Sequence, residues 1–553
     1  MGVFLKTLSS RQQNPTGRRW IYVPYDQMSD AVGPLSREDP ATLGILLIET
    51  SWKGNRRPYH KQKLALILAN SRHFALEQAA RGVAVRYVFA STPYMRVIQE
   101  QLAELGALRV MIPAERELRK DLESLGKVQG IAFLPHEGWV TQGSHFLERK
   151  APWRMDAFYR QVRQDTGLLM RSGKPEGGQY SYDTENRLPW KGEPSAPNPP
   201  SFPLDPIKEE VGRLINRKFS HHPGDLDLKA LPSTREDANK LWTWAKSKCL
   251  PFFGPYEDAM STQSSNLFHT RLSQLVNIHR ILPAQVLRDV QEMDLPLASK
   301  EGFVRQVLGW REFVHQVHGV TDGFRALPGT HPTASRKPGD GGYRRWAGKS
   351  WSTTHGTHDP DGGASPSVLG AKNPLPPAYW GEPSGLACLD RVVSCVWREA
   401  YSHHITRLMV LSNIATLLDV SPRELTDWFW VAYVDAYDWV VEPNVLGMGT
   451  YALGDLMTTK PYVSGTPYIL RMSNYCEECA FDPKRSCPMS SLYWAFLKRH
   501  EEGLRKNPRM RVPLSRLAKR TQSLSLKDRA IYEKVQENLI RGDRLTPKAF
   551  EDR

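Results

Sequence analysis

The first 140 residues alternate short apolar runs with longer helical patterns, and this order constrains the fold more than any other feature of the chain. Strands that alternate with helices form a mostly parallel sheet that is covered on both faces. We therefore predict an α/β, Rossmann-like domain over residues 1–140, with its clearest helix at 60–81. The predicted strands are 20–23, 43–49, 83–89, 110–113 and 131–134.

Polar residues follow several of the predicted strands. Ligands of parallel sheets bind at the carboxyl ends of the strands, and these ends carry Asp26, Gln27, Glu49 and Glu115. The chain has no GxGxxG motif, so a dinucleotide site of the Rossmann type is not indicated.

The remainder of the chain is predicted to be helical. Apolar residues recur at helical spacing over 236–553, which predicts an all-α domain. Residues 141–235 are interpreted as an interdomain linker, because 173–205 is rich in turn-forming Gly and Pro. A break at 328–377 is interpreted as a mobile insertion. The predicted helices are 237–248, 267–281, 286–293, 302–318, 388–418, 422–434 and 526–540.

Charge and cysteine content limit the possible partners and compartments. A net charge of +15 favours a polyanionic partner such as nucleic acid or an anionic membrane, and the alternative is a solvated basic surface. No stretch approaches the roughly 20 apolar residues that span a bilayer. Six cysteines in a large chain without the apolar core of a signal peptide argue against a disulfide framework. We expect a reduced, cytoplasmic protein that is monomeric.

Five of the six cysteines are candidate metal ligands. Cys476, Cys479 and Cys487 form a C-x2-C-x7-C pattern, and Cys388 and Cys395 lie upstream. Four thiolates suit a zinc ion as well as an iron–sulfur cluster, and composition alone favours zinc. The spacing does not choose between the two upstream cysteines. The sixth, Cys249, is predicted to be a buried core residue.

Several motifs occur in an order that resembles the photolyase/cryptochrome superfamily, and in particular its bacterial iron–sulfur branch, the prokaryotic (6-4) photolyases. The resemblance extends over about 22–496, and its strongest signature contains the tandem pair His403-His404. The motifs are 400–409 (AYSHHITRLM) with Asn413, 434–448 (VDAYDWVVEPNVLGM), 253–260 (FGPYEDAM), 267–273 (LFHTRLS), 306–312 (QVLGWRE), 60–63 (HKQK), 72–74 (RHF) and 154–159 (RMDAFY).

The resemblance implies a [4Fe-4S] cluster and FAD in the helical domain. The cluster ligands it implies are Cys388, Cys476, Cys479 and Cys487. For the FAD phosphates, amides and hydroxyls at a helix N-terminus are needed, and residues 268–273 are predicted to begin such a helix. The implied FAD residues are Tyr256, His269, Thr270, Arg271, Leu272, Ser273, Gln306, Trp310, Arg311, Arg407, Asp435 and Asn444, with Arg407 and Asp435 as an ion pair beside the flavin ring.

One departure from the family pattern concerns the flavin. The pattern places an acid beside the ring, whereas this chain has Val441 at that position and Glu442 one position later. We therefore expect the control of flavin protonation to differ from that in relatives.

The implied activity is light-driven electron transfer from reduced FAD to a flipped-out pyrimidine lesion, followed by proton transfer. His404 is the candidate proton donor, supported by His403, because histidine titrates near neutral pH. Leu408 and Tyr462 are expected to line the lesion pocket. Electron transfer is assigned to Trp428 and Trp380, with Tyr437 and Tyr468 as intermediates.

Further ligands follow from the same resemblance. The antenna is expected to be 6,7-dimethyl-8-ribityllumazine in the N-terminal domain, with Asp26, Gln27, Glu49 and His60 as candidates by position. Asp183 and Asp258 are candidates for Mg²⁺, which prefers oxygen ligands. The expected partner is ultraviolet-damaged DNA, bound through Lys174, Arg187 and the basic region after residue 505; a bacterial enzyme of this kind is nucleoid-associated while bound.

Two other functions remain open. A cryptochrome-like blue-light receptor shares the same motifs, although the His403-His404 pair favours repair. A primase-like or structural iron–sulfur protein that binds nucleic acid without photochemistry would not need the flavin motifs. The prediction is a (6-4) DNA photolyase.

Overall fold

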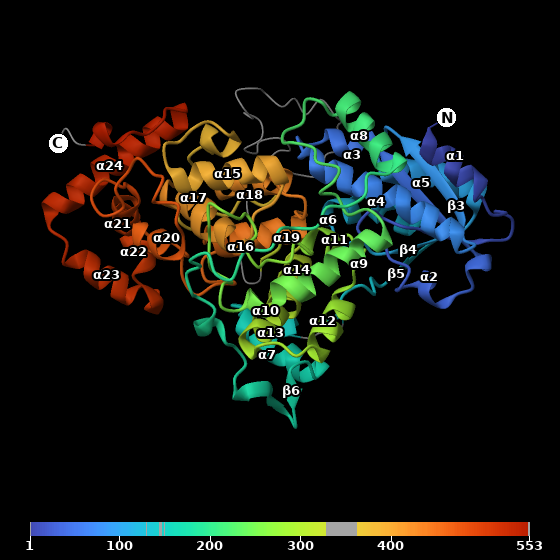
Figure 1. Cartoon of the computed structure of the whole chain (residues 1–553), viewed down its shortest axis with the longest axis horizontal. Coiled ribbons are helices and arrows are strands. Elements are labelled where there is room, and N and C mark those ends of the chain that lie inside the picture. The colour runs from blue at the N-terminus through green and yellow to red at the C-terminus, as the bar shows by residue number, and fades with distance from the viewer. Residues whose placement is uncertain (1, 129, 143–145, 149, 328–361, 551–553) are drawn as a thin grey trace.

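The computed structural model describes residues 2–128, 130–142, 146–148, 150–327 and 362–550. Figure 1 shows an α/β part formed by the N-terminal residues and a larger helical part that continues to the C-terminus. In the described residues, no helix is long and apolar enough to cross a membrane.

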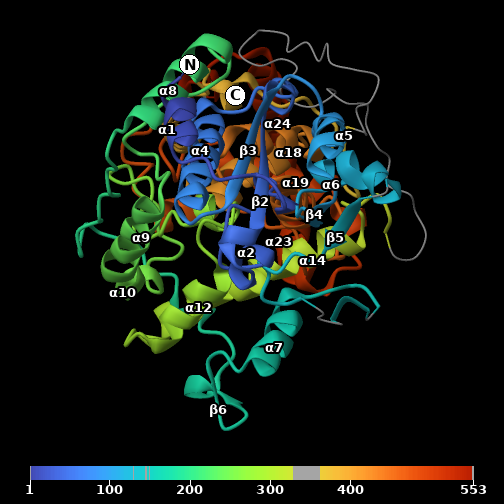
Figure 2. The ribbon, with the colours of Figure 1, turned by 90° about the vertical axis from the view of Figure 1, so that its right-hand side faces the viewer.

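A five-stranded parallel sheet forms the centre of the N-terminal part, in the order β3-β2-β1-β4-β5. All eight residues of β2 are buried, as expected of a parallel strand that is covered on both faces. Figure 2 shows α1 and α4 on one side of the strands and α5 and α6 on the other. The α/β prediction is confirmed. The elements are β1 (Arg19–Tyr22), β2 (Leu43–Thr50), β3 (Ala84–Ala90), β4 (Leu108–Met111), β5 (Ile131–Leu134), α1 (Val3–Ser10), α4 (Lys61–Ala80), α5 (Tyr94–Leu105) and α6 (Arg116–Glu123).

The segment predicted as a linker contains regular structure that packs against both parts. α7 (Met155–Thr166) packs against the π-helical turn η7 (Arg305–Arg311) of the helical part. α8 (Pro206–Lys218) packs against α1 and α4 of the N-terminal part. Between α7 and α8, β6 (Met170–Arg171) and β7 (Lys174–Pro175) form an antiparallel hairpin. Residues 141–235 are therefore not a free connection, because each end of the segment is packed onto the part that it covers.

The helical part differs from the prediction at two places. Within 267–281 only α11 (Ser273–Val276) is helical, because Leu267, Arg271 and His279 have φ of 42°, 55° and 57°. The pattern predicted as one helix over 388–418 divides at Ala400, whose φ is 52°. Further helices are α9 (Arg235–Trp244), α12 (Pro283–Glu292), α13 (Leu297–Val304), α14 (Glu312–Val320), α15 (Ala387–Glu399), α16 (His404–Thr406), α18 (Pro422–Ala432), α19 (Asp438–Glu442), α20 (Thr466–Met472), α21 (Met489–Arg499), α23 (Arg511–Ala518) and α24 (Gln522–Arg541).

The predicted insertion at 328–377 is divided by what the structure describes. Residues 328–361 lie outside the described residues. Residues 362–377 are packed onto the helical part: Arg423 donates to the carbonyl of Ala364 at 3.3 Å, and the amide of Asn373 donates to that of Leu418 at 2.7 Å. These contacts do not fit a mobile segment over 362–377.

A buried seam at 430–438 joins the two parts of the molecule. The Lys63 ammonium of α4 donates to the carbonyl of Trp430 at 2.9 Å and to that of Ala436. The Asp438 carboxylate accepts from the first two backbone N–H groups of α6 at 3.1 and 2.9 Å. An acid at this position caps a helix and favours its positive end. The N-terminal sheet is thereby held by groups of the helical part.

His60 crosses the same seam. Its backbone N–H donates to the carbonyl of Val431 at 2.8 Å. Its Nδ1 accepts from the backbone N–H of Gln62 at 3.1 Å, which caps α4, and its Nε2 lies 2.9 Å from the carbonyl of Trp397. The neutral ring with its proton on Nε2 satisfies both contacts, whereas a proton on Nδ1 would face the Gln62 donor. Burial accordingly lowers the pKa of His60 to about 4.

We predict that this histidine makes the protein sensitive to mild acid. The folded-state pKa of His60 is below its ordinary value of about 6.5, so the unfolded chain binds the proton more readily. The stabilisation is complete above pH 6.5 and is lost as the pH falls from there toward 4. His60 alone accounts for about 2 kcal/mol between pH 7 and pH 5. Urea unfolding at both pH values should show this loss in the wild-type protein.

The control variant is His60→Asn, which keeps an acceptor for the N-cap but does not titrate in this range. We expect this variant to be less stable than the wild-type protein at pH 7 and to lose less stability between pH 7 and pH 5. An equal loss in both proteins would contradict the role of His60. His222 and His136 have pKa values lowered by burial to about 3, so the total acid sensitivity exceeds the part due to His60.

Candidate active site

A cavity of about 300 Å³ lies in the helical part. Three π-helical turns border it, at Arg305–Arg311, Arg407–Ser412 and Pro443–Gly449. Such turns are frequent at functional sites. The cavity brings together every predicted FAD residue except Tyr256. These are His269, Thr270, Arg271, Leu272, Ser273, Gln306, Trp310, Arg311, Arg407, Asp435 and Asn444, and His403, His404 and Leu408 also line it.

The loop over 267–272 supplies one wall of the cavity. It is not the helix start that its sequence predicted, because positive φ at Leu267 and Arg271 turns the backbone away from a helix. Arg271 is held in place by an ion pair with Glu399, and its guanidinium lies 4.4 Å from the Tyr401 ring centre. The helix begins only at Ser273, and α11 is a single turn.

A buried ion pair lies on another wall. Arg407 donates to both carboxylate oxygens of Asp435, at 3.1 and 3.0 Å, and the Ser273 hydroxyl donates to the same carboxylate at 2.6 Å. Burial alone would raise the pKa of Asp435, but the Arg407 guanidinium and these hydrogen bonds hold it below its ordinary value. The carboxylate therefore stays ionised, and the predicted pair is formed.

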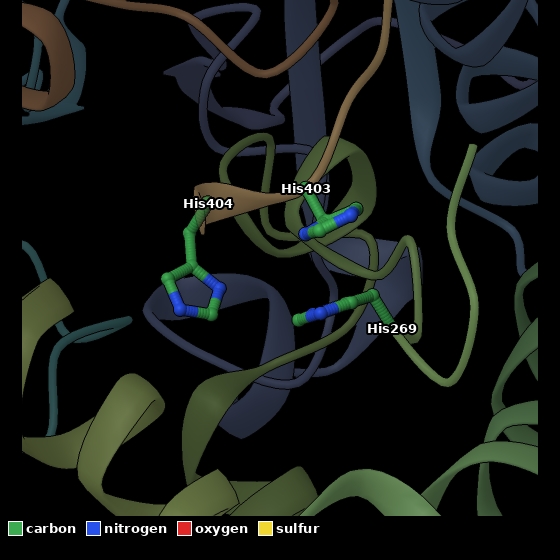
Figure 3. Close-up of side chains that lie close together, drawn as sticks. All are labelled: His269, His403 and His404. Atoms are coloured by element: carbon green, nitrogen blue, oxygen red, sulfur yellow. The ribbon is translucent and has the colours of Figure 1, made fainter. Parts of the chain in front are cut away.

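Three histidines meet at the cavity, as Figure 3 shows. The rings of His269 and His403 are stacked with centres 4.4 Å apart and planes 8° apart, and the His404 ring lies to one side. A metal ion lies near the plane of each imidazole that binds it, so two stacked rings do not aim their nitrogens at one ion. His269 Nε2 is also 3.1 Å from the carbonyl of Glu257. The trio is therefore a stacked pair, His269 and His403, with the His404 ring edge-on beside it.

His403 is buried, and its Nδ1 has no hydrogen-bond partner among the described residues. Burial, followed by the nearby His404 and Arg407, keeps the pKa of His403 well below its ordinary range. His404 exposes 39% of its side chain, although it lies deep between the loops that form the cavity. This desolvation, together with Arg305 and Arg407, lowers its pKa to about 4.

Two acids lie behind His404. Asp258 Oδ1 is 3.9 Å from His404 Nε2, and burial raises the pKa of Asp258 to about 6. Asp183, the other predicted magnesium ligand, pairs with Arg187 and with Arg305. The Arg187 guanidinium also lies 3.9 Å from Asp258. A cation from the protein itself therefore occupies the space between the two acids that were predicted to bind magnesium.

Glu442, adjacent to the cavity residue Val441, points elsewhere. Its carboxylate accepts from Arg423 at 2.7 Å and lies 2.8 Å from His318 Nε2. The side chain is fully buried. Although burial opposes ionisation, the Arg325 and Arg423 guanidinium groups and the hydrogen bond to His318 hold the pKa of Glu442 far below its ordinary value. Val441, which lines the cavity, leaves that wall apolar.

Tyr256 and Tyr462 do not line the cavity. Tyr256 packs on Phe268 with ring centres 5.3 Å apart, and its hydroxyl donates to the carbonyl of Glu193 at 3.2 Å. Tyr256 and Tyr462 were each predicted from a motif or its spacing. In the structure, the Tyr256 ring packs on Phe268 and lies outside the lining of the smaller cavity. Tyr462 lies near Asp183 and Arg187, outside the lining of the cavity.

A second, larger cavity of about 890 Å³ lies at the carboxyl ends of β2 and β3. Tyr25, Tyr59, Tyr94 and Tyr437 contribute rings to its lining, and Arg72 and Glu49 form a bidentate ion pair in it. The hydroxyl groups of Tyr25 and Tyr437 are buried and have no hydrogen-bond partner in the part of the chain that is described.

Of the four residues predicted at this site, only Glu49 lines the cavity. The Asp26 carboxylate instead accepts from the backbone N–H groups of Ala114 and Glu115 at 3.0 and 3.4 Å. Gln27 donates to the carbonyl of Met111 at 3.0 Å, and His60 caps α4. These polar residues form hydrogen bonds with backbone groups of the protein itself. Their position in the sequence alone does not distinguish this role from ligand binding.

Four cysteines line a third, small cavity. Cys388 comes from α15, and Cys476, Cys479 and Cys487 come from the loop between α20 and α21. Their other neighbours are mostly apolar. Cys395 does not line this cavity, and its sulfur lies 3.5 Å from the Arg398 guanidinium. Cys249 is buried, as predicted.

The predicted electron-transfer residues lie in three places. Trp428 and Trp380 both contact Trp397, which the sequence did not single out. Tyr437 lines the larger cavity, and the Tyr468 hydroxyl donates to Asp258 at 3.3 Å. Neither tyrosine has a ring contact with Trp428 or Trp380 in the described residues, and their role as intermediates stays a prediction.

The chain is similar in sequence to known photolyases. The model of the deoxyribodipyrimidine photo-lyase-related protein family matches residues 21–230. The chain is 29% identical over 523 residues to a protein named (6-4) photolyase from Agrobacterium fabrum, covering 90% of this chain and 95% of that protein. The chain is therefore similar to this photolyase-related family over residues 21–230, and to the (6-4) photolyase over most of its length. The resemblance to the photolyase/cryptochrome superfamily is therefore confirmed.

Two solved structures are also similar to this chain. One is a bacterial class III photolyase from Agrobacterium tumefaciens, with 15% identity, a TM-score of 0.46, and coverage of 97% of this chain and 98% of that one. The other is an archaeal photolyase from Sulfolobus tokodaii, with 14% identity, a TM-score of 0.49, and coverage of 94% and 100%.

We predict that Asp435→Asn is strongly destabilising. It removes one charge of a buried pair and leaves the Arg407 guanidinium uncompensated, which costs about 3–5 kcal/mol. Urea unfolding of the purified protein measures this loss. The matched control is Glu104→Gln, whose ion pair with Arg86 is exposed and contributes below about 1 kcal/mol. Equal losses in the two variants would contradict the role of the buried pair.

Proposed function

We propose that the protein is a light-dependent (6-4) photolyase, which restores (6-4) pyrimidine photoproducts in ultraviolet-damaged DNA. The observation that carries this proposal is the position of His404, which lines the same cavity as the buried Arg407–Asp435 pair. The relative named (6-4) photolyase, which aligns over 90% of the chain, supports the same activity.

The residues of the smaller cavity fit FAD. When bound, reduced FAD supplies the light-driven electron for the lesion. The loop amides and the Thr270 hydroxyl suit its phosphates, whereas the Ser273 hydroxyl supports Asp435, and the Arg407–Asp435 pair suits the polar edge of its ring. The indole N–H of Trp439 and Nε of Arg271 are buried there without partners in the described residues, which is expected of groups that a ligand satisfies.

At the lesion, the residues of the protein hold the proton that is transferred during repair. His404 lines the cavity, and its Nε2 lies 3.9 Å from Asp258 Oδ1, so a proton on His404 gains a nearby carboxylate. Arg305 and Arg407 lower the pKa of His404 in the free protein. A DNA phosphate at the cavity mouth offsets these two cations, so that binding of damaged DNA raises the pKa of His404 and charges the donor. Leu408 contributes apolar surface beside it.

The four cysteines suit a [4Fe-4S] cluster better than zinc. A tetrahedral zinc ion holds its thiolate sulfurs about 3.8 Å apart, from Zn–S bonds of about 2.3 Å. In the described residues, no three cysteine sulfurs lie within 4.8 Å of one another. A four-iron cluster lies between its ligands and keeps them farther apart. The apolar surroundings favour a structural cluster shielded from water.

The larger cavity suits an aromatic antenna chromophore. Four tyrosine rings provide flat surface, and the unpartnered hydroxyls of Tyr25 and Tyr437 offer hydrogen bonds to a polar heteroaromatic ring. The family resemblance implies 6,7-dimethyl-8-ribityllumazine. Of the residues predicted at this site, Glu49 is the one whose side chain reaches the cavity.

Damaged DNA is the proposed partner, because the net charge of +15 favours a polyanion. Lys174 lies on an exposed hairpin, and the partly exposed Arg187 lies 3.9 Å from Asp258, the acid beside His404. Magnesium at Asp183 and Asp258 would compete with Arg187 for the same carboxylates. We therefore place Mg²⁺ at this site only when a DNA phosphate draws Arg187 away.

The proposed activity is tested with an oligonucleotide that carries a (6-4) thymine photoproduct. We expect the fully reduced wild-type protein to restore the thymines under blue light. His404→Ala should retain FAD, seen by its absorbance, and lose at least about 100-fold in repair, since it removes the general acid. His221→Ala, which changes an exposed histidine, should repair at the wild-type rate.

Absence of repair by the fully reduced wild-type protein would contradict the proposal. Bound FAD with normal photoreduction but no repair would instead favour the cryptochrome-like photoreceptor. Normal repair by His404→Ala would leave the function standing and show that the proton comes from another residue.

A second prediction concerns the cysteines. Cys388→Ser, purified without oxygen, should lose its iron and labile sulfide, because it removes one of four ligands. Cys395→Ser is the matched control on the same helix and should keep the wild-type content, because its sulfur lies outside the cavity. Metal analysis that finds zinc in place of iron would contradict the cluster, and loss of iron from Cys395→Ser would contradict the ligand set.

A further inference from the structure

A buried acid lies next to the smaller cavity and has no part in the proposed repair reaction. Glu257 exposes 3% of its surface. Its carboxylate accepts from Nε2 of Gln306 at 2.6 Å and from Nδ2 of Asn186 at 2.6 Å. Gln306 lines the cavity, whereas Glu257 does not. The carboxylate therefore contacts the cavity only through the amide of Gln306.

We propose that Glu257 positions this amide, so that the carbonyl oxygen of Gln306 faces the cavity and accepts from the imide N–H of a bound pyrimidine. The 5′ base of a (6-4) lesion keeps such an N–H between two carbonyl groups. The 3′ base has become a pyrimidone, whose ring nitrogen at the same position carries no hydrogen. The inference rests on the proposed function and names the half of the lesion that lies at Gln306.

The hydrogen bonds of Glu257 fix the orientation of the Gln306 amide. An ionised carboxylate only accepts hydrogen bonds, so the amide turns its N–H2 group toward Glu257 and its oxygen away from it. Burial raises the pKa of Glu257 to about 7, whereas the Arg305 guanidinium at 3.4 Å and the two amides favour the ionised form. Above pH 7 the carboxylate thus keeps the amide in one orientation.

This orientation leaves an unpaired acceptor at the cavity. The carbonyl oxygen of Gln306 accepts no hydrogen bond from any residue that the structure describes. An acceptor that loses its water to a ligand costs free energy unless the ligand donates to it. A base with an N–H at this point satisfies the oxygen, and a base with a lone pair there repels it. Gln306 therefore discriminates between the two halves of the lesion.

The carboxylate is itself held from several sides. Gly302 of α13 passes so close that a Cβ atom there would lie 3.1 Å from Glu257 Oε2 and 2.7 Å from Asn186 Nδ2. The backbone carbonyl of Glu257 lies 3.1 Å from His269 Nε2. Because these contacts fix Glu257, the amide that donates to it is fixed as well.

The flavin ring also carries an imide N–H, but the neighbours of Gln306 favour the lesion. Arg305, the residue before Gln306, is one of the charges that lower the pKa of His404. Asp258, the residue after Glu257, lies 3.9 Å from Nε2 of His404. Gln306 therefore lies on the side of the candidate proton donor, where the lesion is proposed to bind.

The experiment measures binding in the dark at pH 8 with two oligonucleotides. One carries the (6-4) thymine photoproduct, and the other carries the same lesion with a methyl group on the imide nitrogen of its 5′ base. The FAD-loaded wild-type protein should bind the first at least about tenfold more tightly, because the methyl group leaves the Gln306 oxygen unpaired. Glu257→Gln should reduce this preference to within about threefold, because its own N–H2 group can bind the Gln306 oxygen.

Two further variants separate positioning from loss of charge or of packing. Glu257→Asp keeps the charge but is one methylene shorter, so the preference should fall as in Glu257→Gln. Glu301→Gln is the matched control, because Glu301 is a buried acid of α13 that accepts from the backbone N–H of Tyr182 at 2.8 Å. In the described part of the chain it makes no hydrogen bond with Gln306, so this variant should keep the wild-type preference.

A double variant shows whether Glu257 acts through Gln306. Gln306→Met removes the acceptor and should lose the preference by itself. Adding Glu257→Gln should then change the preference by less than about twofold, because two changes that act through one group do not add. The wild-type preference in Glu257→Gln and Glu257→Asp would overturn the inference, as would additive losses in the double variant. Loss of FAD with an unchanged preference would assign the imide N–H to the flavin and overturn it too.

Failure of the proposed function gives a different result. Repair of the unmethylated lesion by the reduced wild-type protein is measured separately under blue light. If the lesion is bound with the expected preference but is not repaired, the proposed function fails and the positioning role of Glu257 stands. If the lesion is repaired but is bound without a preference for the N–H, the proposed function stands and the inference fails.

Discussion

The buried segment over 428–439 is the constraint on which both cavities depend. Its backbone carbonyls accept from His60 and Lys63 of the N-terminal part, and Asp438 caps α6 there. The same segment carries Asp435, which holds Arg407 at the smaller cavity, and Tyr437, which lines the larger one. Because these side chains share one short stretch of fixed backbone, the two cavities cannot shift independently of each other.

The smaller cavity combines fixed charge with neutral, titratable rings. Arg407 and Asp435 compensate each other and retain their charges in the interior, since each has a strong partner. The histidines on the opposite side are held neutral by burial and by the nearby guanidinium groups. A negatively charged ligand therefore alters the histidines more than the ion pair, which suits a site that binds DNA before it transfers a proton.

Much of the fold was predictable, because its signals are local. The apolar runs of the strands predicted the parallel sheet, and the motifs predicted eleven residues that line one cavity together. The helix predicted at 267–281 failed because positive φ at Leu267 and Arg271 is not encoded by apolar spacing. Asp26 was predicted at a ligand site that it does not line, and Trp397 was not singled out, for another reason. Whether an acid accepts from the backbone or binds a ligand, and which of many tryptophans touch, depends on tertiary packing.

A shift of one residue explains why the wall beside Val441 has no acid. Successive residues of a helix are about 100° apart, so an acid one position after Val441 faces a different direction. There Glu442 joins Arg423 and His318 in a fully buried cluster, where its charge stabilises the packing of α18 and α14 on α19. The Glu442 carboxylate therefore has a structural role. Proton control at the cavity is left to groups on its other walls, of which the His403-His404 pair, neutral in the free protein, is the predicted one.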